Sequence, residues 1–404
     1  MSYTILCTRC GKEIASEGYA YLCPGCGGIL EIEYDMPSLR EELPAGWPML
    51  GKGMETYKGL LPIGPDSSWV SLGEGSTPLV PSVVDGECEV FFKNEGANPT
   101  GSFKDRPISL VVTKARGIGA EVLITSSSGN AGVSLAAYAA RANLEAYVLV
   151  AESTPPGKLK QIGAHGAKIF RVKGDVSRAF EIALAVSNEL GYVNAATTFL
   201  SPYPTEGDKT VAYEIFSQLE RDVPDWIFIP IGAGPLLAGC YKGFEELVQL
   251  RIAGKMPRLV GVQAEGCSPI ALAFRKGASR VLPWCNEVKT VATGIADPLT
   301  GYPQDGEYVL KLITLTKGLA ISVTDGEIFS ATKQLAEREG IWAEPTGAVG
   351  LAGFWELLRR GVVQPGEKVV ILVTGHGMKD PVITSAEYPL VEDLRSLLKM
   401  IERG

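Results

Sequence analysis

From Glu87 onward the sequence alternates short apolar runs with helical patterns, and this alternation restricts the fold more than any other feature. The run EVLITSSSGN (residues 121–130) is typical of a strand followed by a turn of small residues, and an alanine-rich helical pattern covers residues 131–142. The same strand-and-turn order recurs at residues 225–239 and 368–380. Strands that are joined through helices form parallel sheets with helices on both faces. We therefore predict an α/β fold, and a length of 404 residues indicates more than one domain.

Net charge and hydropathy exclude several classes of partner. The chain has a formal net charge of −8 and a pI of about 5.2, with both signs of charge interspersed. A nucleic-acid groove or a membrane-surface site needs a basic face, so we expect neither partner. No apolar run is long enough to span a bilayer, and the sequence does not open on a signal-peptide pattern. These features predict a cytoplasmic enzyme that acts on a small molecule.

Four of the eight cysteines form two CxxC pairs near the start of the chain, Cys7 with Cys10 and Cys23 with Cys26. Two such turns can direct four thiolates to one point, and the glycines after each pair let backbone amides approach the sulfur atoms. We predict a zinc-ribbon-like module over residues 1–35, with a structural zinc because four thiolates leave no open coordination position. The alternatives are a ribbon without metal, or two disulfides, which a reducing cytosol disfavours.

Three segments place small polar residues where a strand ends and a helix begins, which is where parallel sheets bind ligands. Ser126–Asn130 offers hydroxyls and free amides to a carboxylate or phosphate, or serves only as a helix cap. Pro230–Gly239 has the glycines of a phosphate cradle but neither a Walker loop nor a complete dinucleotide fingerprint. Val373–Asp380 contains His376, which is one of the two histidines of the chain; the other is His165. No G-x-S-x-G elbow accompanies them, and His376 is expected to be a structural hydrogen-bonding group.

The segment NPTGSFKDR (residues 98–106) raises the question of what Lys104 does. Beside Asp105 and Arg106, this lysine could be an ordinary solvated charge on a surface helix. Together, however, a lysine after a Gly-Ser-Phe turn, a phosphate cradle without nucleotide motifs and a carboxylate-sized Ser/Asn loop fit an amino acid bound as an imine to pyridoxal 5'-phosphate (PLP). We therefore predict a PLP enzyme with a small amino-acid substrate.

The sequence resembles the threonine synthase family of PLP enzymes, which has the tryptophan synthase β-like fold. The resemblance extends from the cysteine pairs through GEGSTPL, NPTGSFKDR, SSSGNAG, EGDKTVAYEI and EPTGA to VTGHGMKD. It implies two parallel-sheet domains behind the ribbon: a large PLP-binding domain made of residues 36–104 and 211–404, and a small mobile domain of residues 105–210. It also implies a homodimer, a lyase-type activity in amino-acid biosynthesis, and a small domain that closes over the substrate.

The resemblance also implies roles for individual residues. Lys104 is similar to the Schiff-base lysine that carries protons during the reaction, and Thr374 to the hydroxyl that meets the pyridine nitrogen. Asn130 is similar to the residue that binds the 3'-oxygen of PLP. The loop that matches the cofactor phosphate site consists of Gly232, Ala233, Gly234, Pro235 and Leu236. The residues that match the substrate-carboxylate site are Ser127, Ser128, Asn130 and Ala131.

Two segments depart from the family pattern and bear on the substrate. Before the Glu-Gly of residues 206–207 the family often has Asn-Pro-x-Arg, whereas this chain has Ser201 and Pro204, so the arginine for the phosphate of O-phosphohomoserine is missing. In the glycine loop the family commonly has asparagines where this chain has Ala233, Pro235 and Leu236. Lys158, Lys160 and Lys209 are candidates to replace the positive charge of that arginine.

We predict threonine synthase chemistry, which is γ-elimination of phosphate followed by addition of water at Cβ. The first alternative is a related enzyme that performs β-elimination or β-replacement on a serine-, threonine- or phosphoserine-like amino acid, such as an ammonia-lyase or a cysteate-synthase-like enzyme. The second is a catalytically inactive zinc-ribbon binding protein. Residues 296–308 are expected to form a loop near the mouth of the active site.

Overall fold

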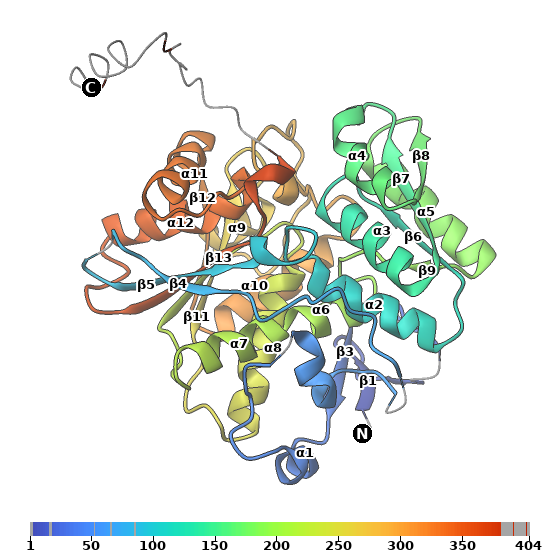
Figure 1. The fold of residues 1–404 in the computed structure, drawn as a ribbon, viewed down its shortest axis with the longest axis horizontal. Coiled ribbons are helices and arrows are strands. Elements are labelled where there is room, and N and C mark those ends of the chain that lie inside the picture. Colours follow the sequence, from blue (N-terminus) through green and yellow to red (C-terminus); the bar gives the residue numbers. More distant parts are fainter. Residues whose placement is uncertain are drawn as a thin grey trace.

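The computed structural model describes residues 3–15, 18–51, 53–64, 67–84, 86–380, 391 and 401. It contains three sheets, shown in Figure 1. A six-stranded sheet and a four-stranded sheet lie side by side, and a three-stranded sheet near the N-terminus packs below them. The predicted α/β fold with parallel sheets is confirmed.

The six-stranded sheet has the order β12-β11-β10-β13-β5-β4, and all neighbouring strands are parallel except β4, which is antiparallel to β5. Its strands are β4 (Leu79–Pro81), β5 (Glu89–Asn94), β10 (Trp226–Pro230), β11 (Arg258–Ala264), β12 (Leu319–Val323) and β13 (Lys368–Val373). Because both faces are covered, a central strand such as β10 is buried at every residue and its sequence, WIFIP, is a continuous apolar run.

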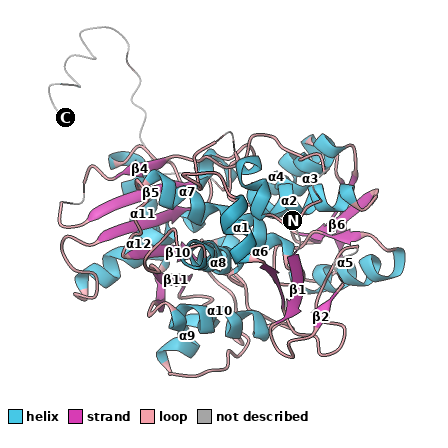
Figure 2. Cartoon of the chain, turned by 90° about the horizontal axis from the view of Figure 1, so that it is seen from below, coloured by secondary structure: helices cyan, strands magenta, loops and turns pink. Residues whose placement is uncertain are grey.

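Successive residues of these strands contribute to two separate hydrophobic cores. Phe228 packs into the core beneath α12, whereas Ile227 and Ile229 pack into the core on the opposite face. Figure 2 shows the strands flanked by helices. The helices around this sheet are α6 (Tyr203–Asp208), α7 (Thr210–Gln218), α8 (Pro235–Gln249), α9 (Pro269–Arg275), α10 (Pro303–Leu315), α11 (Asp325–Arg338) and α12 (Pro345–Arg359).

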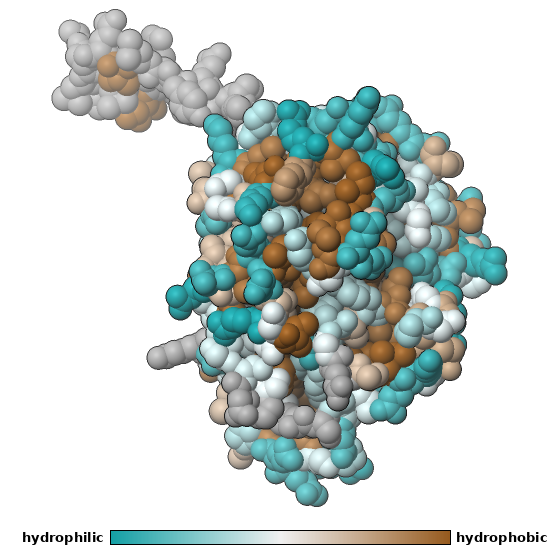
Figure 3. Space-filling view, turned by 90° about the vertical axis from the view of Figure 1, so that its right-hand side faces the viewer, coloured by the Kyte–Doolittle hydropathy of each residue, from teal (hydrophilic) through white to brown (hydrophobic). Residues whose placement is uncertain are grey.

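The four-stranded sheet has the order β8-β7-β6-β9 and is entirely parallel. Its strands are β6 (Val122–Ser126), β7 (Glu145–Ala151), β8 (Lys168–Val172) and β9 (Val193–Asn194), and its helices are α2 (Asp105–Gly117), α3 (Asn130–Ala142), α4 (Pro156–Ala164) and α5 (Val176–Leu190). Small cores fill both faces, one with α3 and α4 and the other with α5. On the side of the molecule that carries this sheet, apolar side chains lie among charged ones (Figure 3), and Phe170, Val176 and Leu190 are exposed.

The N-terminal sheet has the order β2-β1-β3 and is antiparallel. Its strands are β1 (Tyr3–Cys7), β2 (Glu13–Ile14) and β3 (Leu30–Tyr34), and the short helix α1 (Met36–Glu42) follows. Asp35 caps that helix by accepting a hydrogen bond from the backbone amide of Ser38. Turns of 3-10 helix complete the described secondary structure at Met54–Leu60, Glu95–Ala97, Thr293–Ile295 and Gly377–Lys379. Among the described residues, no helix combines the length and apolar character needed to cross a bilayer.

Candidate active site

The loop that carries Lys104 pairs with the loop that follows β13. Ser102 and Gly375 form an isolated antiparallel bridge, and the backbone amide of Phe103 donates to the carbonyl oxygen of Thr374 at 3.0 Å. The amide of His376 donates to the carbonyl oxygen of Gly101 at 2.8 Å. Two segments that are about 270 residues apart in the sequence, 101–104 and 374–376, are thereby held as one backbone unit at the carboxyl end of β13.

Lys104 lies immediately before helix α2, with its ammonium group turned into the protein. The Nζ atom donates to Thr197 Oγ1 at 2.8 Å and lies 4.5 Å from the centre of the Phe103 ring. Burial lowers the pKa of Lys104, while the carboxyl groups of Asp208 and Asp297 oppose that shift. A lysine with a lowered pKa is more often the uncharged amine, which is the form that attacks a carbonyl group.

The helix that follows Lys104 does not begin on a solvated surface, because the two residues after this lysine are fully buried. Asp105 and Arg106 both have 0% exposure. The Arg106 guanidinium pairs with Glu95 Oε2 at 2.7 Å and with Glu214 Oε2 at 2.7 Å, and Lys93 Nζ completes the cluster at 2.6 Å from Glu214. The two positive charges and the two negative charges of this buried cluster therefore cancel. This cluster fixes the start of α2, and with it the position of Lys104.

Several buried polar atoms around Lys104 have no hydrogen-bond partner among the described residues. They include Thr374 Oγ1, Ser102 Oγ and both carboxylate oxygens of Asp208. Unpartnered buried polar atoms are costly in a finished protein interior. Thr374 and Ser102 belong to the paired loops just described, and Asp208 acts electrostatically on Lys104. A polar group that binds beside Lys104 would give the Thr374 and Ser102 hydroxyls a hydrogen-bond partner, so these two residues and Lys104 fit the expected PLP.

The predicted phosphate loop, residues 232–236, joins β10 to helix α8. Gly234 is the N-cap of α8 with φ of +93°, a conformation that favours glycine, and Pro235 occupies the first turn. A Cβ atom placed on Gly234 would lie 2.6 Å from a methyl carbon of Val309. The backbone therefore approaches its neighbour closely, and the free amides of the first helical turn face the end of the loop. Ala233 and Leu236 are buried and line the same turn.

The Ser/Asn loop lies between β6 and α3. Ser127 Oγ accepts from the amide of Gly129 at 3.3 Å, and a Cβ atom placed on Gly132 would lie 2.1 Å from the carbonyl oxygen of Ser127. The first turn of α3 thus folds directly onto the loop. Asn130 Nδ2 donates to Glu344 Oε1 at 2.8 Å, which links this loop to the start of α12. Ser127, Ser128 and Asn130 are partly exposed and Ala131 is buried, so the loop presents polar atoms at a surface.

Sequence reasoning did not identify the carboxyl groups near Lys104. Asp297 accepts from the amide of Leu299 at 2.9 Å and from the Tyr302 hydroxyl at 3.1 Å, and its pKa is raised by burial. Its Cβ atom would be 3.2 Å from a Cβ placed on Gly232, so it borders the predicted phosphate loop. The expectation of a loop over residues 296–308 is only partly correct, because α10 begins at Pro303. No local pattern marks Asp297 as a neighbour of Lys104.

The lysines proposed to replace the family arginine differ in their surroundings. Lys209 is fully buried and pairs with Glu206 Oε2 at 2.7 Å and with Glu246 Oε1 at 2.8 Å. It is therefore committed to the protein interior, and the suggestion that it binds a substrate phosphate is wrong. Lys160 is exposed on α4. The side chain of Lys158 lies outside what the structure describes.

The four cysteines of the N-terminal module converge as the spacing predicted. Their sulfur atoms all lie within 4.8 Å of one another, with Cys7 to Cys26 at 3.5 Å and Cys10 to Cys23 at 3.8 Å. A tetrahedral zinc with Zn–S bonds of about 2.3 Å separates its sulfur ligands by about 3.8 Å. A Cβ atom placed on Gly28 would lie 2.7 Å from Cys7 Sγ, so glycine is required beside the cluster. The donor set and its spacing fit a four-thiolate metal site.

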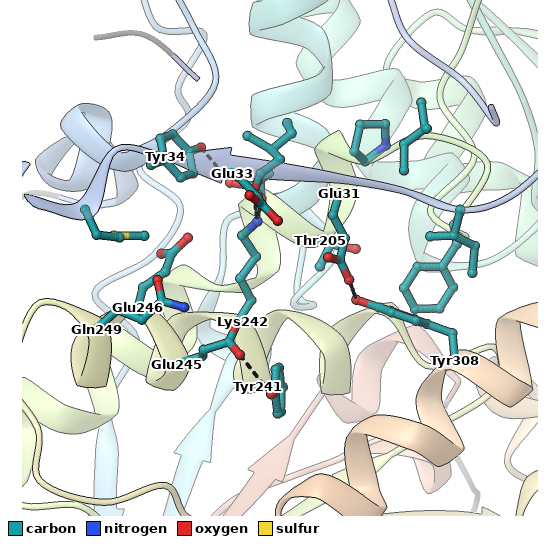
Figure 4. Close-up of a pocket in the computed structure, with 17 residues that line it drawn as sticks. Glu31, Glu33, Tyr34, Thr205, Tyr241, Lys242, Glu245, Glu246, Gln249 and Tyr308 are labelled. Atoms are coloured by element: carbon teal, nitrogen blue, oxygen red, sulfur yellow. Dashed lines mark hydrogen bonds and ion pairs between the residues drawn. The ribbon is translucent and has the colours of Figure 1, made fainter. Parts of the chain in front are cut away.

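A polar pocket of about 200 Å³ separates β3 of the N-terminal module from α8. In the close-up of Figure 4, Lys242 extends from α8 toward β3, where it pairs with Glu206 Oε1 at 2.6 Å. The Tyr34 hydroxyl of β3 donates to Glu206 Oε2 at 2.6 Å, and Tyr308 of α10 donates to Glu31. Lys242 also donates to the carbonyl oxygen of Ile32 in β3, which attaches the N-terminal module directly to the helix that begins at the predicted phosphate loop.

The chain matches a family of known enzymes over most of its length. Residues 70–375 match the family described as "Pyridoxal-phosphate dependent enzyme". The chain is 39% identical to the threonine synthase of Methanocaldococcus jannaschii, with 98% of both chains covered. It is 37% identical to the threonine synthase of Methanosarcina acetivorans, with 97% of this chain and 96% of that protein covered.

Solved structures with a similar fold are more distant in sequence. A threonine deaminase isoform from Solanum lycopersicum has a TM-score of 0.63 and 23% identity, covering 81% of this chain and 82% of that one. Maize serine racemase has a TM-score of 0.64 and 22% identity, covering 81% of this chain and 93% of that one. These likenesses show the fold alone. The two sequence matches to threonine synthases, each spanning nearly the whole chain, establish that this chain belongs to the threonine synthase family of pyridoxal-phosphate dependent enzymes.

Proposed function

We propose that the chain catalyses the threonine synthase reaction, converting O-phosphohomoserine and water to threonine and inorganic phosphate. The Cγ–O bond to the phosphate breaks and the hydroxyl group of water bonds to Cβ. Overall, Cβ loses one proton, Cγ gains one, and the second proton of water leaves with the phosphate, while the Cα proton is removed and returned. The observation that carries this proposal is the inward-facing Lys104 among unpartnered polar groups, in a chain that aligns with threonine synthases almost from end to end.

PLP, when bound, withdraws electrons from the amino-acid carbons so that their protons become acidic. The residues proposed to hold it are Lys104, Thr374, Asn130 and the loop of residues 232–236. Lys104 accepts and returns the protons at Cα and the neighbouring carbons, and its lowered pKa supports this role because a base must be uncharged to accept a proton. The Thr374 hydroxyl, which has no partner among the described residues, would be a neutral partner for the pyridine nitrogen, and a neutral partner there would favour elimination and replacement over transamination.

The remaining residues bind and orient the substrate. Ser127, Ser128, Asn130 and Ala131 are proposed to hold its carboxylate at the N-terminus of α3, where free amides and the helix dipole favour an anion. We also propose that residues 105–210 form the small domain that closes over this carboxylate. The location of all strands of the four-stranded sheet within residues 122–194 supports that division. The homodimer and the cytoplasmic location remain predictions.

The reaction can be tested by following phosphate release from O-phosphohomoserine with PLP-loaded enzyme. We expect inorganic phosphate and threonine in equal amounts, with Lys104→Ala as the inactive control. Release of ammonia from serine or threonine, without phosphate release from O-phosphohomoserine, would instead support the β-eliminating alternative. In that case Pro204 and Leu236 would mark a change of substrate.

We further propose that Cys7, Cys10, Cys23 and Cys26 bind one structural zinc ion. The double substitution Cys23→Ser and Cys26→Ser should remove the metal, because two hydroxyls do not replace two thiolates as zinc ligands. We expect about one zinc per chain in the wild type and almost none in the variant, with a lower midpoint of thermal unfolding. Elemental analysis and calorimetry measure the two quantities. Cys285→Ser, at an exposed cysteine outside the cluster, should change neither.

A further inference from the structure

Asp208 is a buried carboxyl group to which no described residue donates a hydrogen bond. It ends α6, has 1% exposure, and neither of its carboxylate oxygens has a partner among the described residues. An ionised carboxylate in such a place loses its hydration and gains no hydrogen bond in return, whereas the protonated acid carries no charge to stabilise. The local geometry therefore favours the neutral form.

The helix that carries the predicted phosphate loop encloses Asp208. A Cβ atom placed on Gly239 of α8 would lie 2.6 Å from the Cβ of Asp208, so the backbone of α8 passes directly over this side chain. Gly239 is about one helical turn beyond the loop of residues 232–236. An anion bound at the start of α8 would therefore lie about one helical turn from the point where Asp208 packs against that helix.

The charged and titratable groups that face Asp208 come from three elements. Lys104 and Arg106 lie at the start of α2, Glu95 follows β5, and Cys240 lies on α8. Arg106 is already paired with two carboxylates, and Glu95 adds negative charge. Lys104 makes no ion pair within 4.0 Å among the described residues, so it does not hold Asp208 in the ionised form by direct contact. In agreement with this balance, burial raises the pKa of Asp208 to about 8.

We propose that Asp208 is held as a neutral carboxylic acid and that binding of the cofactor requires this uncharged form. This proposal rests on the proposed function, because it takes Lys104 and the start of α8 as the cofactor site. PLP brings an anionic phosphate to a site that already contains Asp208 and Asp297. An ionised Asp208 would repel that phosphate, and the low dielectric constant of the interior would strengthen the repulsion. Asp208 thus acts on the cofactor electrostatically, as a positioning residue.

The test is to measure the dissociation constant of PLP as a function of pH. Apoenzyme would be titrated with PLP between pH 7 and 9.5 at constant ionic strength, following the absorbance of the bound cofactor. Asp208→Asn keeps the shape of the side chain but does not ionise. We expect the ratio of the wild-type to the Asp208→Asn dissociation constant to stay constant below about pH 8. Above that pH it should rise, by up to about tenfold per pH unit. Asp222→Asn, at an exposed aspartate, should follow the wild type.

Two further measurements separate the ways in which this test can fail. If wild-type enzyme shows no absorbance band that depends on Lys104, the cofactor site itself is wrong. If the band is present and the ratio of dissociation constants does not change with pH, ionisation of Asp208 plays no part. Infrared difference spectra of wild-type enzyme, with and without PLP at pH 8.5, need no variant. The C=O stretch of a newly protonated carboxyl group should appear on binding, and its absence would overturn the proposal.

Discussion

Lys104→Ala should abolish the reaction and remove the covalent link between enzyme and PLP. An alanine cannot bond to the cofactor or exchange protons with the substrate, and a positioned acid–base group typically contributes about 10²–10⁴-fold to the rate. We therefore expect phosphate release to fall by at least about 10³-fold. The absorbance of lysine-bound PLP should vanish, and treatment with borohydride should no longer attach the cofactor to the chain.

Lys333→Ala is the matched control for this prediction. Lys333 is an exposed lysine on α11, outside the candidate site, and its loss should leave the absorbance and the rate unchanged. Substantial activity in the Lys104→Ala variant, with PLP still attached to the chain, would show that a different lysine binds the cofactor.

Arg106→Met should strongly destabilise the protein. The substitution leaves Glu95 and Glu214 buried with Lys93 as the remaining cation of the cluster. Removing one partner of a buried ion pair costs about 3–5 kcal/mol, because the other charge is left without compensation. Urea unfolding should show a loss of free energy of unfolding in this range.

Two comparison variants test whether the loss of stability in Arg106→Met comes from an unpaired buried charge. Lys168→Met breaks an exposed pair with Glu145, and the urea midpoint should not move measurably. Arg106→Met combined with Glu95→Gln should recover part of the lost stability, because one uncompensated carboxylate is removed. If the double variant is no more stable than Arg106→Met alone, the loss arises from packing around the guanidinium rather than from charge.

The order of elements was predictable because it depends on local patterns. A strand such as β10 is buried on both faces, so its residues must all be apolar, and the sequence WIFIP shows this directly. The two CxxC pairs are equally local, since each turn holds its own sulfur atoms and the short antiparallel sheet brings the two turns together. The motif around Lys104 is likewise local, and together with the glycine loop and the Ser/Asn loop it indicates PLP chemistry without any tertiary contact.

The electrostatic surroundings of Lys104 could not be read from the sequence. Asp208 and Asp297 are about 100 and 190 residues away along the chain, and each acts on Lys104 only because the fold brings α6 and the segment before α10 within electrostatic reach of this lysine. A charged residue in a helical pattern is usually solvated, so Arg106 resembled a surface residue. It is buried because the tertiary structure places the carboxylates of Glu95 and Glu214 beside its guanidinium group.

The sequence by itself thus determined the fold class, the cysteine cluster and the lysine on which the family resemblance rests. Periodicity and motif spacing are properties of residues that are close together in the sequence, so they can be recognised without knowledge of the fold. The tertiary structure decided which charges are buried, which are paired and which buried polar atoms lack a partner. Those properties depend on the distance between remote segments and on the exclusion of water, and these exist only after the sheets and helices have packed together.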